Sequence, residues 1–567
     1  MFESPIRRHR KVYRLIASVF ISVPIIMGLP STPLDSTSWW VFTLPAIAGT
    51  QNLPDNMVIL IFALLLSIGL VAWAFPRGGG GAAWRNGRNQ MGRVPIPGPN
   101  GLPIFGILFN LSHGLPHRTL ASMASTLTAT KLMAFSLGST PAVITANPHI
   151  AREILNSPHF ADRPIKQSAK SLMFNRAIGF APNGTYWRLL RKIASTHLFA
   201  PRRIVAHEAS RLLDCAAMMH TIADEQSIHG FVCLRKHLQE AALNNVMGTV
   251  FGRRYNQKEC HNMYEVEELR EMVREGFEIL GAFNWSDYVP WISLFYDPFR
   301  IRERCEALAP RVKKFVKQVL DEHRMSPFKG LRDGSDFVDV LLSLEWDEKL
   351  QDDDMIAVLW EMIFRGTDTT ALLTEWVMAE IVLNQDVQTR LRNEIERVVG
   401  DKKEVTDADV AKLPYLEAIV KETLRLHPIG PLLSWARLST SDVQLSNGMV
   451  VPANTTTMVN MWAITHDPNV WEEPLVFKPE RFVKSEGGVD LDVRGVDLRL
   501  APFGAGRRVC PGRNLGFVTV TLWVANLVHQ FGWFQHMANP VDLNEMLKLS
   551  CEMKNPLKVV AIPTKLA

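Results

Sequence analysis

Apolar positions recur with helical spacing along most of the chain after residue 200, and this pattern predicts a protein built mainly of α-helices. The periodic stretches cover residues 203–226, 232–253, 262–281, 300–325, 353–384, 386–400 and 406–427, with one more after residue 512. Strand-like runs are few and short, so the expected fold class is mainly α with small β-sheets.

Two hairpins are expected among the short strands. Residues 132–137 and 141–146 predict the first, with its turn around Gly138. The segment VQLSNGMVVPANTTTMVN predicts the second, because the Asn447-Gly448 pair is favoured in two-residue hairpin turns.

The first hundred residues differ in character from the rest. Residues 57–75 are 19 consecutive uncharged and mostly apolar positions, which as a helix would rise about 28 Å against a hydrocarbon core of about 30 Å. Basic residues follow, namely Arg77, Arg85, Arg88 and Arg93. The pattern predicts a membrane span that leaves the following domain in the cytoplasm.

A second apolar stretch, residues 15–29, follows a cluster of arginines and lysine. It could be another span, an interfacial helix or a signal-like region; we favour a membrane hairpin with both ends cytoplasmic. The same Arg-rich start also fits an organelle transit peptide. The prolines of PIPGP at 95–99 end this part, so the expected division is a membrane anchor with a basic linker at 1–94 and one large domain at 95–567.

Composition excludes several classes of protein. Hydrophobic residues make up 47% of the 567, including 28 Phe and 15 Trp, which can fill a large core without disulfides. The net charge of +5 offers no argument for nucleic-acid binding. The six cysteines are too widely spaced for a CxxC redox pair or a zinc knuckle, and we expect all except Cys510 to be packing residues.

The stretch from Asp352 to Gln385 is apolar on nearly every side, but its centre reads GTDTT at 366–370. Gly, Thr and Asp are weak helix formers, and a buried carboxylate is costly unless it is satisfied. We therefore expect a functional site here, with a solvated kink as the alternative. A threonine hydroxyl can also bond a carbonyl one turn back and open the helix locally.

Glu422 and Arg425 stand three positions apart and so share a helix face. The pairs Glu267 with Arg270, Glu271 with Arg274, and Glu394 with Arg397 have the same spacing, and we expect those pairs on the surface. Glu422 and Arg425 differ because leucines flank them, and because FKPERF at 477–482 offers Arg481 as another cation. These three residues predict a buried network.

Residues 503–512 read FGAGRRVCPG, which resembles the haem-binding signature of cytochrome P450s, F-x-x-G-x-R-x-C-x-G. WRLLR at 187–191, GTDTT, the Glu422–Arg425 pair and PERF stand upstream in the order typical of that family. The resemblance covers roughly residue 95 to the C-terminus. The apolar N-terminal part and PIPGP resemble the plant microsomal class, and FRGTDT, FNWSDYVPWI and PLLSWARL resemble the organ-growth group that includes KLUH, family 78, subfamily A.

The resemblance implies a cytochrome P450 fold with an N-terminal membrane anchor, and haem b as the cofactor. It makes Cys510 the thiolate ligand of the haem iron, a donor that favours splitting of the O–O bond of dioxygen. The remaining residues implied at the cofactor are Phe503, Gly506, Arg508, Gly512, Trp187 and Arg191. Arg508, Trp187 and Arg191 would hold the propionates, Phe503 would shield the sulfur, and the glycines would let the backbone approach the porphyrin.

On the other face of the haem, Asp368 and Thr369 resemble the family's acid and alcohol pair, which delivers protons to bound dioxygen. Glu422, Arg425 and Arg481 resemble its structural triad. Phe364, Arg365 and Leu433 would line the substrate pocket.

Arg365 departs from the family, which usually has Ala or Gly at this position. A guanidinium there must find an anion. It could pair with Glu361 or Asp368, which stand at helical spacing, or it could bind a carboxylate of the substrate.

The chain carries no flavin or nicotinamide fingerprint, and GGGG at 78–81 is interpreted as linker. The resemblance therefore implies the membrane-bound NADPH–cytochrome P450 reductase as electron donor, with Arg188, Lys192, Arg507 and Arg513 as candidate contacts. The expected function is that of a monooxygenase which hydroxylates a small apolar molecule, fatty-acid-like or terpenoid, in plant growth. The expected location is the endoplasmic reticulum membrane, where the protein would contact membrane lipid. A reductase-independent haem-thiolate isomerase or dehydratase, and a non-catalytic membrane haem or lipid binding protein, are the alternatives.

Overall fold

A computed structural model describes residues 55–74 and 79–564, apart from 85, 113, 256–262, 291–296, 326–331, 333, 434–435, 494 and 496. The chain divides into two compact units, residues 1–71 and 72–567. The apolar stretch at 15–29 lies outside the described residues. Helix α2 (Asp55–Ala74) covers almost all of the predicted span at 57–75. Within the described ranges, no helix has the length and apolar character that crossing a membrane requires.

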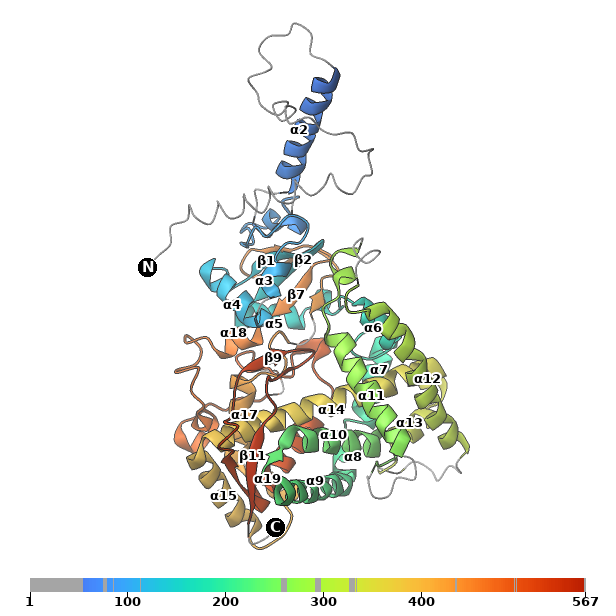
Figure 1. Cartoon of the computed structure of the whole chain (residues 1–567), viewed down its shortest axis with the longest axis vertical. Coiled ribbons are helices and arrows are strands. Elements are labelled where there is room, and N and C mark those ends of the chain that lie inside the picture. Colours follow the sequence, from blue (N-terminus) through green and yellow to red (C-terminus); the bar gives the residue numbers. More distant parts are fainter. Residues whose placement is uncertain are drawn as a thin grey trace, which may run out of the picture. The chain divides into compact units, whose positions relative to one another are not determined.

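The second unit is mainly helical, as the periodicity predicts (Figure 1). Its helices are α3 (Leu108–Leu111), α4 (Pro116–Thr126), α5 (Pro148–Asn156), α6 (Gln167–Leu172), α7 (Thr185–His197), α8 (Pro201–Ala206), α9 (Glu208–His229), α10 (Leu234–Phe251), α11 (Met263–Gly281), α12 (Ile301–Met325), α13 (Phe337–Ser343), α14 (Asp352–Leu383), α15 (Gln385–Val399), α16 (Asp407–Val410), α17 (Pro414–Leu426), α18 (Met461–Thr465) and α19 (Arg513–Gln530).

Two of the predicted helices are each divided in the structure. The stretch 203–226 belongs to α8 and α9, which are separated at His207, whose backbone is not helical. The stretch 406–427 belongs to α16 and α17, because Pro414 cannot continue a helix through its own N–H and instead begins a new one. Apolar periodicity does not register such breaks of one to three residues.

The first predicted hairpin is confirmed. Strands β1 (Met133–Leu137) and β2 (Thr140–Thr145) pair antiparallel, from Met133 opposite Ile144 to Leu137 opposite Thr140. Gly138 takes a φ of 58° in the turn, a conformation that favours glycine. Strand β7 (Thr456–Val459) adds parallel to β2, and β4 (Arg437–Leu438) completes a sheet in the order β1-β2-β7-β4.

The second predicted hairpin is also present. Strands β5 (Val443–Gln444) and β6 (Val450–Val451) pair across a turn in which Gly448 has a φ of 81°. The remaining strands form two small sheets. One contains β3 (Val232–Cys233), β11 (Lys558–Pro563) and β8 (Phe531–Gln535), and the other is a hairpin of β9 (Glu545–Leu547) and β10 (Cys551–Met553).

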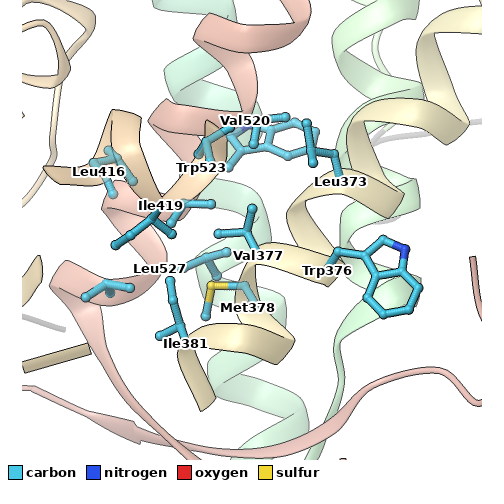
Figure 2. Close-up of a cluster of buried hydrophobic side chains, with 14 of the residues drawn as sticks. Leu373, Trp376, Val377, Met378, Ile381, Leu416, Ile419, Val520, Trp523 and Leu527 are labelled. Atoms are coloured by element: carbon cyan, nitrogen blue, oxygen red, sulfur yellow. The ribbon is translucent and has the colours of Figure 1, made fainter. Parts of the chain in front are cut away.

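Helix α14 is the centre of the core and packs against α10, α11, α12, α17 and α19 (Figure 1). Acidic residues at its start complement the positive end of the helix dipole. In its C-terminal half, Val377, Met378 and Ile381 face Ile419 of α17 and Leu527 of α19, as Figure 2 shows. Trp376 points away from this cluster, and its indole N–H donates to the Cys551 carbonyl at 3.2 Å. The side chains around α14 are therefore fixed from several directions.

Glu422, Arg425 and Arg481 meet in the interior, as the network hypothesis predicts. Both side chains of the first pair are completely buried and share two hydrogen bonds of 2.8 Å. Arg481 Nε lies 3.3 Å from Glu422 Oε1. Arg425 also donates to the carbonyls of Thr465 at 2.9 Å and Pro474 at 2.7 Å. The network thus joins α17 to the segments that follow α18.

The other Glu–Arg pairs with this three-residue spacing differ in burial. Glu267 and Arg270 lie on the surface with 3.8 Å between their charged atoms, as expected. Glu394 does not, so that expectation was wrong: it is buried and accepts the backbone N–H groups of Tyr415 at 3.0 Å and Leu416 at 3.2 Å. The first turn of a helix leaves N–H groups without helical partners, and here α17 binds the carboxylate of α15.

Removing one partner of the buried network should destabilise the second unit strongly. In Glu422→Ala the Arg425 guanidinium stays buried without a counter-charge, which costs about 3–5 kcal/mol. The free energy of unfolding, measured in denaturant with haem content followed in parallel, should fall accordingly. Glu267→Gln removes a carboxylate at the same sequence spacing on the surface and should leave the unfolding midpoint unchanged. Equal effects of the two substitutions would contradict the buried role of Glu422.

Candidate functional site

The loop before α19 presents Cys510 at the start of a helix. Gly504 and Gly506 take φ values of 71° and 66° in this loop, and a Cβ on Gly506 would lie 2.0 Å from the Leu155 carbonyl oxygen. The backbone N–H of Cys510 donates to the Phe503 carbonyl at 2.9 Å, which closes the loop. Only glycine permits both the left-handed backbone and this close approach to α5.

The surroundings of the Cys510 sulfur act on its pKa in opposite directions. Burial raises the pKa of the thiol, while a hydrogen bond from the Gly512 N–H and the charges of Arg365, Arg191 and Arg513 lower it. Such groups favour the thiolate, the form that binds metals. Among the other cysteines, Cys215, Cys305 and Cys551 are buried, Cys233 is half-buried, and Cys260 lies outside the described residues.

Trp187 and Arg508 pack directly on one another. The Arg508 guanidinium carbon lies 4.1 Å from the centroid of the Trp187 ring, and the indole N–H donates to the Ile178 carbonyl at 3.0 Å. Arg508 itself donates to the carbonyls of Ala161 at 2.8 Å and Ala181 at 2.7 Å. Arg191 lies on the next turn of α7, with its guanidinium 5.9 Å from the same ring.

Positive charge accumulates around Arg508. Besides Arg191 the cluster contains Arg163, from the segment before α6, and Arg437, from β4. Burial first, and then the neighbouring guanidinium groups, lower the pKa of Arg437 to about 9; the pKa of Arg508 falls to about 10, again mainly through burial. Each cation thus disfavours the charge of the next.

The acids within reach of this cluster are Asp162, which raises the pKa of Arg508, and Glu361. Arg365 is a further neighbour of Arg163, so five guanidinium groups stand against two carboxylates and leave an excess of positive charge. Charges inside a protein are stable when they are paired. A ligand with two carboxylates would reduce the excess. Haem, which the resemblance implies, carries two propionates, and the residues present fit it: a sulfur in a glycine-bent loop and a cluster of cations beside it.

On α14 the helix continues through the GTDTT segment without a break. The hydroxyls of Thr367 and Thr369 donate to carbonyls one turn earlier, to Ile363 at 2.6 Å and Arg365 at 3.1 Å. Thr369 is exposed, whereas Asp368 is half-buried. The expected back-bonding of threonines is therefore present, and the helix accommodates it.

Asp368 faces the β9–β10 hairpin. Burial, followed by the charge of Glu552, raises the pKa of Asp368 to about 6, while a hydrogen bond with Ser550 and the charges of Arg235 and Lys548 act in the opposite direction. A cavity of about 770 Å³ adjoins this carboxylate. Its polar lining near Asp368 consists of Arg235 of α10, Thr367, and Lys548, Ser550 and Glu552 of the hairpin.

The three residues expected in a substrate pocket lie in different environments. Phe364 is completely buried and stacks on Phe277 of α11, with ring centroids 4.1 Å apart, so the structure places it in a helix interface. Arg365 lies beside Glu361 and not beside Asp368, with 3.7 Å between Nε and Oε1. Leu433 has a φ of 47° in the loop after α17. Their roles at a substrate stay predictions.

The sequence analysis missed Arg163, Arg437 and Ser550. Arg163 directly follows Asp162, and Arg437 stands in a two-residue strand, so neither shows a periodic or motif signal of burial. Ser550 lies in a hairpin turn that is 182 positions away from Asp368 along the chain. Only the folded chain brings these groups to the site.

Comparison with known proteins agrees with this geometry. The Cytochrome P450 family model matches residues 96–558. Cytochrome P450 78A7 of Arabidopsis thaliana is 65% identical over 540 residues, which cover 94% of this chain and 99% of that protein. Cytochrome P450 78A11 of Oryza sativa subsp. japonica is 59% identical over 546 residues, covering 94% and 98%. Trimethyltridecatetraene synthase of Zea mays is 36% identical over 507 residues, covering 84% and 90%.

The cysteine loop, the cation cluster and these relatives lead to the same assignment. The chain belongs to the cytochrome P450 family, is similar to its 78A members over most of its length, and is a haem-containing monooxygenase.

Proposed function

We propose that this monooxygenase hydroxylates a small apolar molecule, fatty-acid-like or terpenoid, with dioxygen and with electrons from NADPH passed through the NADPH–cytochrome P450 reductase. The observation that carries the proposal is the pairing of two sites in one domain: Cys510 in its closed loop beside the arginine cluster, and Asp368 with Thr369 on α14. The first can hold haem, and the second can supply protons.

In this proposal Cys510 binds the haem iron, and Arg163, Arg191, Arg437 and Arg508 hold the propionates. When bound, haem with a thiolate ligand supplies the activation of dioxygen. Trp187 keeps Arg508 in place through the stacking contact, and Phe503 and Gly512 fix the sulfur through the backbone of its loop. The chain's own task here is to exclude water and to keep the sulfur ionised.

Proton delivery falls to Asp368 and Thr369. A carboxyl with a pKa of about 6 can both release and accept a proton near neutral pH. Ser550 orients this carboxyl toward the cavity beside the hairpin, from which it can be reprotonated. Thr369 stands next to it with an exposed hydroxyl, and is the group that would pass the proton onward.

The apolar character of the proposed substrate has two supports. Aromatic and aliphatic side chains dominate the N-terminal half of α14 and the helices that contact it. The maize relative is named for a branched tetraene hydrocarbon, which favours a terpenoid without excluding a fatty-acid-like molecule. A role in plant growth and development is part of the proposal, on the basis of the resemblance to the organ-growth group.

We place the enzyme at the endoplasmic reticulum membrane with its catalytic domain, residues 95–567, in the cytoplasm. The support is the sequence of residues 1–94, with its apolar stretch at 57–75 and the arginines that follow it. Arg188, Lys192 and Arg507 are exposed near the cysteine side and are candidate contacts for an acidic reductase surface, although Lys192 already pairs with Glu348 at 2.7 Å.

Consumption of oxygen coupled to NADPH in the presence of reductase tests the function as a whole. Peroxide rearrangement without reductase would favour an isomerase or dehydratase instead, and haem binding without either reaction would favour a non-catalytic binding protein. Spectral shifts across a panel of fatty acids and terpenoids would identify the substrate.

Replacing Cys510 with serine should remove the iron's sulfur ligand. We expect Cys510→Ser to lose the carbon monoxide absorption characteristic of a thiolate-bound haem, and to lose oxygen transfer, because an alcohol does not donate electron density as a thiolate does. Cys233→Ser, at a half-buried position, is the control and should keep both. Retention of the normal absorption in Cys510→Ser would exclude the proposed site.

Replacing Asp368 with asparagine should separate stability from activity. Because the folded protein raises the pKa of this carboxyl to about 6, folding favours its protonated form, and the associated stability is lost as the pH rises through that value. Asp368→Asn should therefore be more stable than the parent at pH 7.5, by up to about 2 kcal/mol, and no more stable at pH 4.5.

The same variant should transfer oxygen at least tenfold more slowly at neutral pH, since an amide cannot relay the proton. Asp353→Asn, an exposed acid at the start of α14, should change neither property. Undiminished turnover of Asp368→Asn would remove this residue from the proposed relay.

A further inference from the structure

Arg365 stands where most of the family has a small residue, and the structure shows an anion beside its guanidinium. Its Nε lies 3.7 Å from Oε1 of Glu361, one turn earlier on α14, and that carboxylate is almost completely buried. The guanidinium carbon also lies 5.5 Å from the centroid of the Phe180 ring. Burial raises the pKa of Glu361 and lowers the pKa of Arg365, and each charge opposes the shift of the other.

Glu361 has a second set of partners, and they belong to a loop. Its Oε1 accepts the backbone N–H of Gly179 at 2.8 Å, and the N–H of Ile178 also bonds to this carboxylate. Residues 177–181 lie between α6 and α7, far from α14 in sequence. The carboxylate therefore joins the helix that carries Asp368 and Thr369 to this loop.

The loop can approach only because residue 179 is glycine. A Cβ built there would lie 2.5 Å from Glu361 Oε1 and 2.8 Å from Arg365 Nη2. Real Cβ atoms do not approach polar atoms so closely, so a side chain at residue 179 would force the buried carboxylate or the half-buried guanidinium to shift. Gly179, Glu361 and Arg365 are thus fitted to one another.

The opposite side of the same loop is held by the cysteine segment. Arg508, two residues before Cys510, donates to the carbonyls of Ile178 at 3.2 Å and Ala181 at 2.7 Å. The peptide group between Ile178 and Gly179 is consequently bound from both directions, its N–H by Glu361 and its carbonyl by Arg508 and Trp187. A change in the position of this loop would reach both the α14 side and the cysteine side of the site.

We propose that the buried Glu361 carboxylate and the half-buried Arg365 guanidinium form an ion pair that positions loop 177–181, and that this pair, which we call the loop clamp, holds the α14 side and the cysteine side of the haem site in register. Arg365 is thereby a positioning residue and not the anchor of a substrate carboxylate. A second carboxylate beside Arg365 would leave a buried negative charge in excess, because Glu361 already balances the guanidinium. The inference rests on the proposed haem site.

The loop clamp also bears on the substrate class. Because Glu361 accompanies Arg365, this guanidinium does not require a carboxylate from a ligand. Neutral molecules, such as hydrocarbons and alcohols, fit it as well as acids do, and the proposed apolar substrate requires no carboxylate.

A double-mutant cycle on the holoenzyme tests the clamp. Glu361→Gln leaves Arg365 without its counter-charge, Arg365→Met leaves Glu361 without its own, and the double variant removes both charges while the glutamine oxygen can still accept from Gly179. Two quantities are measured: hydrogen–deuterium exchange of the backbone amides of residues 177–181, and the rate at which haem transfers to an excess of apomyoglobin.

We expect each single variant to exchange these amides and to lose haem roughly tenfold faster or more, because an unpaired buried charge remains, and the double variant to recover most of both rates. Arg365→Lys, which keeps the charge, should lie between parent and Arg365→Met. Glu306→Gln breaks an exposed pair with Arg302 at the same i,i+4 spacing and should match the parent. If the single variants fail to accumulate as folded protein and the double variant succeeds, that outcome also supports the clamp.

Parent-like exchange and haem transfer in both single variants would overturn the clamp, as would a double variant no better than the worse single one. Binding of dodecanoic acid and of 1-dodecanol, followed by the shift in haem absorption, decides between clamp and substrate anchor. Arg365→Met should change the two affinities by the same factor, and a selective loss of the acid would assign Arg365 to the substrate. Failure of the haem site itself is distinguishable, because Cys510→Ser would then keep its normal absorption.

Discussion

Excess positive charge in the interior is the constraint on which this site depends. Arg163, Arg191, Arg437 and Arg508 come from four separate segments, and burial is the main cause that lowers the pKa of each; neighbouring guanidinium groups add to it. Like charges held so close together oppose folding. In the proposed site the propionates of haem would supply the negative charge, and a ligand that binds only the folded chain adds to its stability.

The remaining structure holds the cluster and the sulfur in fixed positions. Arg508 is tied to three backbone carbonyls and to the face of Trp187, so its charge cannot move away from the site. The network of Glu422, Arg425 and Arg481 fixes α17 against the segments that precede the cysteine loop. Helix α14 crosses between these parts, and two of its carboxylates have different surroundings: Glu361 bonds to the N–H of a neighbouring loop, and Asp368 adjoins a polar cavity.

Features encoded in neighbouring residues could be predicted from the sequence. The helices follow from apolar periodicity and the two hairpins from glycine turns. The cysteine loop follows from residues 503–512, which resemble the haem-binding signature of cytochrome P450s. The Glu422 network could be predicted because leucines around it indicated burial. The breaks at His207 and before Pro414 could not, since one to three non-helical residues barely alter a pattern that repeats every few positions.

Groups that meet only through the tertiary fold were beyond the sequence. Arg163, Arg437 and Ser550 have no local signal, and Glu394 carries the same spacing to an arginine as a surface pair, yet it binds the start of α17 instead. For Arg365 the sequence supplied Glu361 and Asp368 as candidate anions within the chain, and the structure brings Glu361 to 3.7 Å. Which partner a charged side chain finds depends on the polar groups that lie near it in the folded chain, and their positions cannot be read from local sequence.

The position of the β9–β10 hairpin has a consequence for biosynthesis. Asp368 is completed by Ser550 and Glu552, and the strand that follows, β11, pairs with β3 through Val559 opposite Val232. The environment of Asp368 is therefore complete only after residues 550–552 have been synthesised. A nascent chain that already contains its cysteine loop therefore still lacks the groups that set the environment of Asp368.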